Sequence, residues 1–258
     1  MAVLTNNLRK GIASLATSKG RRRSGLFMAE GTKCVLDTLD AFTARYIIAT
    51  REWLEEHPAV AGHAGCDVIA AGRGDIKTMS SMTLAPDVIA VYGLPEQTMP
   101  ATAELRGRLV LALDRVQDPG NMGTIMRTAD WMGVDTILAS DDCVDCFNPK
   151  AIQASMGAIA RVSVFYGDLP GMLDAIGGDI AGTFLDGENV YTAVLPRRGI
   201  IVMGNEGQGI GEAVAARVTR RLLIPSYPPG RPTSESLNVA TATAIVLSQY
   251  ISRNYGKD

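Results

Sequence analysis

The sequence predicts an α/β protein in two parts, a small N-terminal α/β unit followed by a larger unit built on a mostly parallel sheet. Its 258 residues are 47% hydrophobic and 20% charged, which is the composition of a globular protein able to bury a core. Short apolar runs alternate with segments of helical spacing. A Pro-containing, apolar-poor segment then interrupts the alternation near residue 100. These observations predict a first domain at 1–95, a linker at 96–106 and a second domain at 107–258.

The first part begins with a predicted helix at 2–18. Apolar runs then predict strands at 26–31, 45–50, 66–71 and 87–93, with helices at 32–42 and 51–57.

The second part restarts the alternation. Its predicted strands are 108–114, 134–140, 161–167, 179–186, 199–204 and 221–226, and a helix from about 236 to 253 closes the chain. Strands alternating with helices imply a parallel sheet covered on both faces. Ligands of such sheets bind at the carboxyl ends of the strands.

Charge is distributed unevenly. The formal net charge is −2, but residues 1–33 carry seven Lys or Arg against a single Glu, a local charge of +6. Such a patch can bind phosphates, and the candidates are Lys19, Arg21, Arg22 and Arg23. A solvated helix and loop is the simpler interpretation of the same run.

Several classes of protein are disfavoured. No apolar segment predicts a signal peptide or a membrane span, so we expect a cytoplasmic protein. The pair Cys143 and Cys146 forms a CxxC, but neither histidine lies near it, so we expect no metal site. His57 and His63 are the only histidines, which disfavours a triad hydrolase in the second part.

A first chemistry-bearing stretch, "DPGNMGTIMRTADWMG" (118–133), follows the strand at 108–114. It begins with turn formers and continues with helical spacing. Asn121 and Arg127 are therefore placed beside the carboxyl end of a strand.

A second stretch, "GNEGQGIGE" (204–212), follows the strand at 199–204. Gly204 and Gly209 have Walker A spacing, but Ile210 stands where a lysine is needed, and the glycines do not give GxGxxG. Either a helix-leading turn or close backbone approach to a ligand explains these glycines.

A third stretch, "IPSYPPGRPTSESLNVATATAI" (224–245), is a Pro-rich loop leading into the closing helix. Ser236 and Asn238 lie at the start of that helix. Plain N-capping would explain Ser236 but not Asn238.

Together these stretches resemble motifs one, two and three of the SpoU family, the 2′-O-ribose RNA methyltransferases of the SPOUT class. The stretches "SKGRRRSGLFMAEGTKCVLDTL" and "MSSMTLAPDVIAVYGLP" resemble the substrate-binding domain that precedes many SpoU catalytic domains. The resemblance covers nearly the whole chain.

This resemblance implies a deep trefoil knot at the C-terminal end of the sheet, although chain-connection rules disfavour knots. It also implies that S-adenosyl-L-methionine is bound around Gly204, Asn205, Ile224 and Leu237. Trp131 and Met132 depart from the family's usual small or phenylalanine pairing, a difference we attribute to packing.

The implied reaction is attack of a ribose 2′-oxygen on a sulfonium methyl group. The resemblance assigns the catalytic role to Arg127, with Asn121, Glu206, Ser236 and Asn238 around it. A free guanidinium stays protonated at neutral pH, which favours a phosphate and oxyanion clamp over a base, and the sequence leaves both open. The resemblance further implies a homodimer and a ribosomal RNA, most readily 23S, as substrate. The alternatives are a transfer-RNA methyltransferase, a non-catalytic RNA-binding or assembly factor, and, least favoured, a dinucleotide oxidoreductase.

Overall fold

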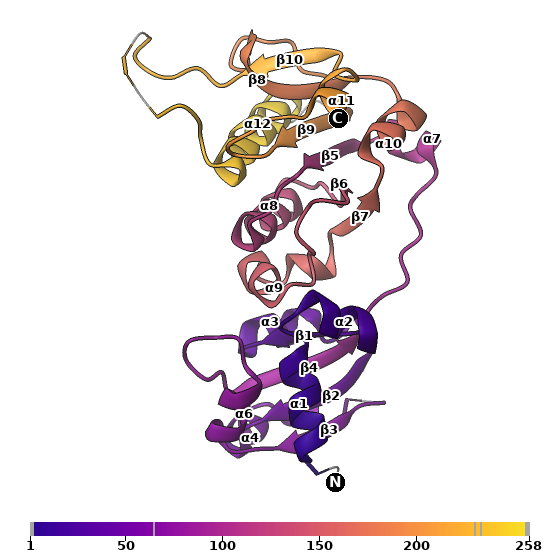
Figure 1. Ribbon diagram of the computed structural model, residues 1–258, viewed down its shortest axis with the longest axis vertical. Helices are drawn as coiled ribbons and strands as arrows, with labels where there is room; N and C mark the ends of the chain where they lie inside the picture. The colour runs from indigo at the N-terminus through magenta and orange to yellow at the C-terminus, as the bar shows by residue number, and fades with distance from the viewer. Residues whose placement is uncertain (1–2, 64, 230, 233, 256–258) are drawn as a thin grey trace. The chain divides into compact units, whose positions relative to one another are not determined.

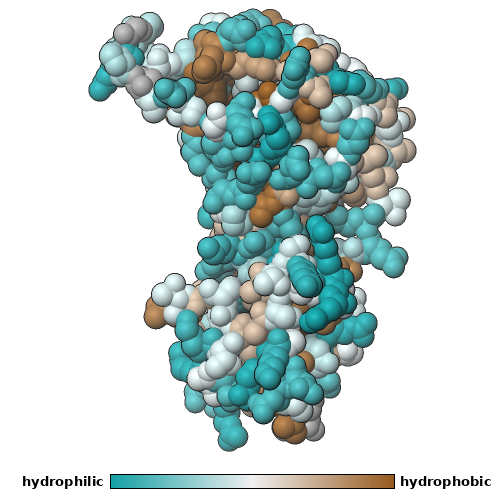
Figure 2. All heavy atoms as spheres, viewed as in Figure 1, coloured by the Kyte–Doolittle hydropathy of each residue, from teal (hydrophilic) through white to brown (hydrophobic). Residues whose placement is uncertain are grey.

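The computed structural model describes residues 3–63, 65–229, 231–232 and 234–255, and its chain forms two compact units (Figure 1). Unit 1 contains Met1–Glu96 and Asp145–Arg161, and unit 2 contains Gln97–Val144 and Val162–Asp258. Hydrophilic side chains cover most of the face seen in Figure 2, with hydrophobic ones scattered among them. No helix within the described residues is long and apolar enough to cross a bilayer.

Unit 1 is built on a four-stranded mixed sheet with the order β1-β4-β2-β3. Its strands are β1 (Leu26–Glu30), β2 (Ala44–Ala49), β3 (Asp67–Ala70) and β4 (Val88–Gly93). β4 runs antiparallel to both β1 and β2, and β2 runs parallel to β3. Its helices are α1 (Asn6–Ser14), α2 (Ser18–Ser24), α3 (Thr32–Thr38), α4 (Arg51–Glu56), α5 (Pro58–Ala61), α6 (Arg73–Met79), α9 (Pro149–Ser155) and the 3-10 turn η1 (Ala158–Ala160).

The helix expected at 2–18 ends at Ser14 as α1, and a second helix, α2, begins at Ser18. The hydroxyl of Thr17 accepts a hydrogen bond from the Gly20 amide at 3.1 Å, so Thr17 is the N-cap of a new helix. A side chain at Gly20 would collide with the Ser14 carbonyl oxygen, so the tight junction depends on glycine. Capping therefore overrides the continuous helical spacing.

Residues 145–161 were expected in the second domain, but they pack within unit 1. The ring of Phe147 lies 4.7 Å from that of Phe27, centroid to centroid. Arg21 is 2% exposed, and its Nε and Nη2 atoms donate to the Asp145 carboxylate at 2.8 and 2.6 Å. Its Nη1 atom donates to the Leu15 carbonyl at 2.9 Å. Aromatic packing and the ion pair of the buried Arg21 with the half-buried Asp145 thus attach this segment to the N-terminal sheet.

Unit 2 contains a six-stranded sheet with the order β10-β8-β9-β5-β6-β7 and parallel pairing throughout. The strands are β5 (Leu109–Asp114), β6 (Thr136–Ser140), β7 (Ser163–Gly167), β8 (Ile180–Asn189), β9 (Gly199–Gly204) and β10 (Arg220–Leu223). The helices are α7 (Thr102–Arg106), α8 (Pro119–Trp131), α10 (Leu169–Ile176), α11 (Glu212–Ala215) and α12 (Val239–Asn254).

The two central strands explain why this sheet is parallel. β5 and β9 are buried along almost their whole length, on both faces, as expected for strands covered by helices on either side. α8 packs against α12; α8 follows β5 after a short turn, whereas α12 follows β10 after the long loop at 224–238 (Figure 1). The alternation in the sequence predicted this arrangement correctly.

The expected linker at 96–106 is wrong in its second half. Residues Thr102–Arg106 form α7, and Leu105 is fully buried in the core of unit 2 beside Ile176 and Ile180. A helix this short leaves too little periodicity to be recognised from sequence.

Replacing Arg21 by alanine is expected to destabilise unit 1 by about 3 kcal/mol, because the change leaves the Asp145 carboxylate without its buried partner. Urea unfolding followed by the fluorescence of Trp53, which is buried in unit 1, measures the loss. The matched control is Arg22→Ala, which removes an exposed cation from the same helix and should stay within about 0.5 kcal/mol of wild type. Equal losses in the two variants would show that the ion pair has no special role.

Candidate active site at the carboxyl ends of the parallel strands

Three loops of unit 2 follow β5, β9 and β10 and contain the stretches singled out in the sequence. The first leads directly into α8, and the third leads into α12. All three leave the sheet at the carboxyl ends of parallel strands, where ligands bind in open α/β sheets.

The side-chain amide of Asn121 joins the three loops. Its Nδ2 atom donates to the carboxylate of Glu206, in the loop after β9. Its Oδ1 atom accepts from Nδ2 of Asn238, in the loop after β10, at 2.9 Å. The hydroxyl of Ser236 donates to the backbone carbonyl of Glu206 at 3.3 Å. The structure therefore brings together four of the five predicted catalytic residues.

Capping fixes the two helices that carry these groups. The Asp118 carboxylate accepts from the Asn121 backbone amide at 2.8 Å, and Pro119 occupies the first turn of α8. Oδ1 of Asn238 accepts from the amides of Ala240 and Thr241 at 3.0 and 3.2 Å, so Asn238 is the N-cap of α12. The sequence analysis attached the capping interpretation to Ser236, which was wrong by two residues.

Arg127, the fifth predicted catalytic residue, lies on α8 and is exposed. Within the described part of the chain, no hydrogen bond or ion pair satisfies its guanidinium. The Glu206 carboxylate accepts from Asn121 and makes no ion pair with Arg127 among the described residues. The cation is free to bind an anion from solution.

The loop after β9 is a tight hairpin. The backbone amide of Asn205 donates to the Gly209 carbonyl at 3.1 Å, and the Gly209 amide donates to the Asn205 carbonyl at 2.8 Å. Oδ1 of Asn205 accepts from the Gly207 and Gln208 amides at 2.9 and 3.1 Å. The side chain of Asn205 thus supports the loop from within, and its expected part in binding the cofactor stays a prediction.

Gly204 is required by this hairpin for a steric reason. A Cβ atom there would lie 2.4 Å from the Gly209 carbonyl carbon and 2.4 Å from the Ile210 nitrogen. Those atoms belong to backbone, which cannot move aside without reshaping the loop. The close approach predicted for this glycine is therefore to its own loop.

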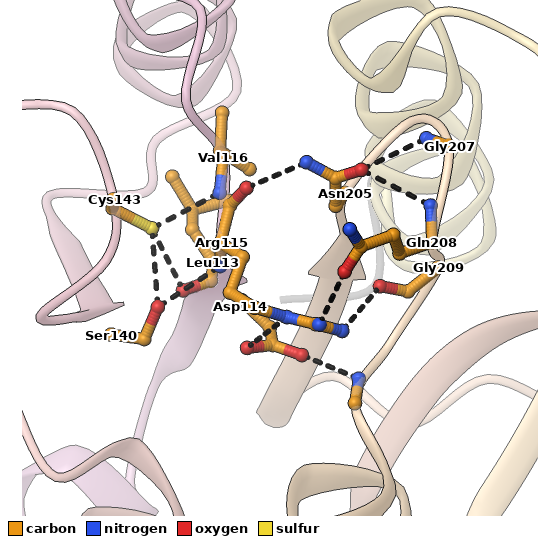
Figure 3. A network of polar contacts seen from close by, with 11 residues as sticks. Leu113, Asp114, Arg115, Val116, Ser140, Cys143, Asn205, Gly207, Gln208 and Gly209 are labelled. Atoms are coloured by element: carbon orange, nitrogen blue, oxygen red, sulfur yellow. Dashed lines mark hydrogen bonds and ion pairs between the residues drawn. The ribbon is translucent and has the colours of Figure 1, made fainter.

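Asp114 and Arg115, at the end of β5, clamp the same loop (Figure 3). The Asp114 carboxylate, 4% exposed, accepts from the Gly211 amide at 2.6 Å. The Arg115 guanidinium donates to Oε1 of Gln208 at 2.7 Å and to the Gly209 carbonyl at 3.3 Å.

Arg115 has a φ of 59°, an unfavourable conformation for a residue with a side chain. Its carbonyl accepts from Nδ2 of Asn205 at 3.0 Å. The sequence analysis missed Asp114 and Arg115 because no local sequence pattern predicts an arginine in the left-handed backbone conformation.

The two remaining residues expected to hold the methyl donor flank the third loop. Ile224 follows β10 directly and is half-buried, and Leu237 is 44% exposed beside Asn238. An exposed leucine next to polar groups and loop backbone fits a ligand with an apolar ring and charged ends. The Pro-rich loop expected between them includes residues 230 and 233, which lie outside the described residues.

The four basic residues proposed for RNA binding lie on α2 of unit 1, but they do not behave alike. Lys19, Arg22 and Arg23 are exposed. Arg21 is buried and bonded to Asp145, so it is not available to a phosphate. The run of four similar residues hides this difference, because only the fold decides which one points inward.

The CxxC pair does not have the features of a metal site. Among the described residues, no three His, Cys, Asp or Glu side chains lie close enough together to hold an ion. Cys143 accepts from the Val116 amide at 3.3 Å, and burial raises the pKa of its thiol. A protonated, buried thiol is a poor nucleophile. Through its contact with the Val116 amide, Cys143 instead supports the junction between β5 and α8.

Two cavities lie in unit 2. One, of about 330 Å³, borders the end of the loop after β9 at Gly211 and is lined by Asp114, Arg115 and acidic residues such as Asp141 and Asp168. The other, of about 260 Å³, lies at the amino end of β9 near Gly199. Neither is lined by Asn121, Arg127 or Asn238. The chemistry of the loops is therefore a better guide to the site than concavity.

Comparisons with known proteins identify the class. Residues 108–248 match the SpoU rRNA Methylase family, and residues 6–90 match the MRM3-like substrate binding domain. The chain belongs to the SpoU rRNA methylase family, as the motifs predicted.

A relative from Bacillus subtilis, named 23S rRNA (guanosine(2553)-2′-O)-methyltransferase RlmP, is 30% identical over 90% of this chain and 91% of its own length. A solved structure from Porphyromonas gingivalis, assigned to the TrmH family of RNA methyltransferases, is 38% identical and covers 98% of this chain and 100% of its own, with a TM-score of 0.86. An AdoMet-bound rRNA methyltransferase from Sinorhizobium meliloti is 27% identical, with coverage of 98% of both chains and a TM-score of 0.83.

These findings confirm the predicted α/β fold class and the prediction of an S-adenosylmethionine-dependent RNA 2′-O-methyltransferase. The trefoil knot stays a prediction from the family resemblance. So do the roles of the individual residues.

Replacing Gly204 by alanine is expected to displace the hairpin at 205–209 and to lower stability by about 1–3 kcal/mol, a usual cost of overpacking. The affinity for S-adenosylmethionine should fall at least about tenfold, or ~1.4 kcal/mol. Denaturant unfolding and calorimetric titration measure the two effects. Gly207→Ala is the control, because a Cβ there meets nothing closer than Oδ1 of Asn205 at 3.7 Å. The steric account fails if both variants bind the donor like wild type.

Proposed function

We propose that this enzyme methylates ribosomal RNA, most readily 23S rRNA, on a ribose 2′-hydroxyl, and that the loops joined by Asn121 form its active site. The observation that carries the site is an exposed Arg127, without a polar partner among the described residues, on the helix whose first turn holds the Glu206–Asn121–Asn238 bridge. The printed activity of the B. subtilis relative, which spans nearly all of this chain, supports the ribosomal target. A cytoplasmic location, expected from the sequence, would bring the enzyme to that substrate.

The 2′-hydroxyl is a poor nucleophile while it holds its proton, so the site must position it and stabilise the developing oxyanion. S-adenosylmethionine supplies the electrophilic methyl group. Arg127 holds the 2′-oxygen and the adjacent phosphate with its planar guanidinium. The proton then passes from the hydroxyl to that phosphate, which the same guanidinium keeps in place.

The polar bridge has a positioning role. The side-chain amide of Asn121 accepts a hydrogen bond from Asn238 through its oxygen and donates one to Glu206 through its nitrogen. Glu206, Asn238 and Ser236 therefore keep the loops in register, while Gly204, Ile224 and Leu237 border the donor. Metal chemistry is not needed for this reaction, since Arg127 provides the positive charge.

Unit 1 supplies the affinity for RNA through Lys19, Arg22 and Arg23. These cations are exposed on α2 and contact backbone phosphates, which hold an RNA in place without reading its sequence. Arg21 is buried and stabilises the unit through its hydrogen bonds to Asp145 and to the Leu15 carbonyl.

Replacing Arg127 by alanine should lower single-turnover methyl transfer at least about a hundredfold, a usual loss when a charge-stabilising group is removed. Donor affinity by calorimetry should change less than about threefold, or ~0.7 kcal/mol, because Arg127 serves the RNA. Arg127→Lys should also fail, because an ammonium lacks the two-point grip. Total ribosomal RNA and total transfer RNA from cells lacking the gene are the substrates.

The control is Arg198→Ala, which removes an exposed cation just before the amino end of β9, away from the carboxyl ends of the strands. This variant should leave turnover unchanged. Full activity of Arg127→Lys, or loss of donor binding by Arg127→Ala, would contradict the role assigned to Arg127. Transfer to transfer RNA alone would move the target away from the ribosome.

A homodimer is part of the proposal, with α12 in the interface. Tyr255, at the end of that helix, is 85% exposed and is the kind of side chain that a partner subunit covers. Light scattering at micromolar concentration should give twice the mass of one chain. A monomer that still methylates RNA would refute this assembly.

A further inference from the structure

Trp131 is the more exposed of the two tryptophans of the chain. Only two tryptophans are present; Trp53 is 3% exposed, whereas Trp131 is 87% exposed. The sequence analysis attributed Trp131 to packing, and the structure shows that this was wrong within the chain. A large aromatic ring held in solvent is characteristic of a binding surface.

The ring lies on the same face of α8 as Arg127. The two residues are four positions apart, so their side chains are neighbours on one helix face. Between and before them, the Thr128 and Thr124 hydroxyls donate back to the carbonyls of Thr124 and Gly120 at 2.9 and 2.8 Å. The free groups on this face are therefore one flat ring and one guanidinium.

We propose that Trp131 stacks on an RNA base beside the nucleotide that is methylated, while Arg127 holds the phosphate between them. This rests on the proposed function. A nucleotide carries a flat base and a phosphate that are joined by its ribose. An aromatic ring and a cation on adjacent helical turns are arranged to bind these two groups together. Aromatic side chains stack on unpaired bases of every type, and sequence-selective RNA proteins use single-stranded bases in this way.

An apolar protein partner fits this face less well. Covering Trp131 would also bury Arg127, whose guanidinium has no partner among the described residues. A buried, unpaired charge costs far more than burial of the ring contributes. An anionic, aromatic ligand satisfies both groups together.

Distance along the helix places the stacked base outside the reacting nucleotide. Asn121 and Trp131 are ten residues apart, a rise of about 15 Å along α8. Trp131 is therefore too far from the polar bridge to hold the target ribose. It binds an unpaired neighbour of any base type, and it contributes to RNA affinity without taking part in the transfer.

Fluorescence provides a direct readout. In a Trp53→Phe variant, Trp131 is the single fluorescent tryptophan, and titration with oligoadenylate should quench its emission strongly. Donor-saturated enzyme should show the same quenching with ribosomal RNA from cells lacking the gene. Emission that stays constant while RNA binds, as shown by filter retention, overturns the proposal.

Steady-state kinetics tests the chemistry with matched variants. Trp131→Leu keeps apolar bulk but removes the π face, and KM for RNA should rise roughly five- to hundredfold, the range for one lost stack. Trp131→Phe should stay within about threefold of wild type. kcat at saturating RNA and the donor affinity should be unchanged in both. Leu185→Ala, which removes an 80% exposed side chain from β8 of the same unit, is the control and should match wild type.

Each other outcome counts against the proposal. If Trp131→Leu and Trp131→Phe are both like wild type while transfer continues, stacking is wrong and the proposed function stands. If Trp131→Leu changes the mass in light scattering, the ring belongs to a subunit interface. A wild-type enzyme that transfers no methyl group to any RNA overturns the proposed function and this inference together.

Discussion

One side-chain amide holds the active-site loops in register. Asn121 reaches from the first turn of α8 to Glu206 and Asn238, which lie after two other strands. An amide is suited to this place because it donates on one side and accepts on the other. A carboxylate at position 121 would oppose Glu206, and an apolar residue would leave two polar groups unsatisfied. The positions of the three loops are thus coupled through a single planar group.

A second set of contacts supports the same loops from below, without entering the site. Asp114 and Arg115 hold the hairpin after β9 through the Gly211 amide, the Gly209 carbonyl and Gln208 (Figure 3). These groups hold the loop, whereas Arg127 on the exposed face of α8 has no hydrogen-bond or ion-pair partner among the described residues. Rigid backbone with one free charge is the arrangement that electrostatic preorganisation requires.

The strands could be predicted from sequence because their signals are local. Apolar runs located β5 and β9, and turn formers placed Asn121 at the start of a helix after a strand. The roles given to Asn121 and Asn238 came from the family resemblance and stay predictions. Other features depend on contacts far along the chain. Arg21 looks like its exposed neighbours until Asp145, 124 residues away, is placed beside it. Likewise, α7 became recognisable only when the fold buried Leu105.

The path of the backbone between the two units limits how this enzyme can be cut or recombined. Because Asp145–Arg161 belongs to unit 1, the chain passes from one unit to the other three times, after Glu96, Val144 and Arg161. A catalytic fragment beginning at residue 97 would retain Phe147 and Asp145 but lose the rings and the guanidinium that they contact. Exchange of the N-terminal module between relatives therefore has to include a short piece from the middle of the methyltransferase sequence.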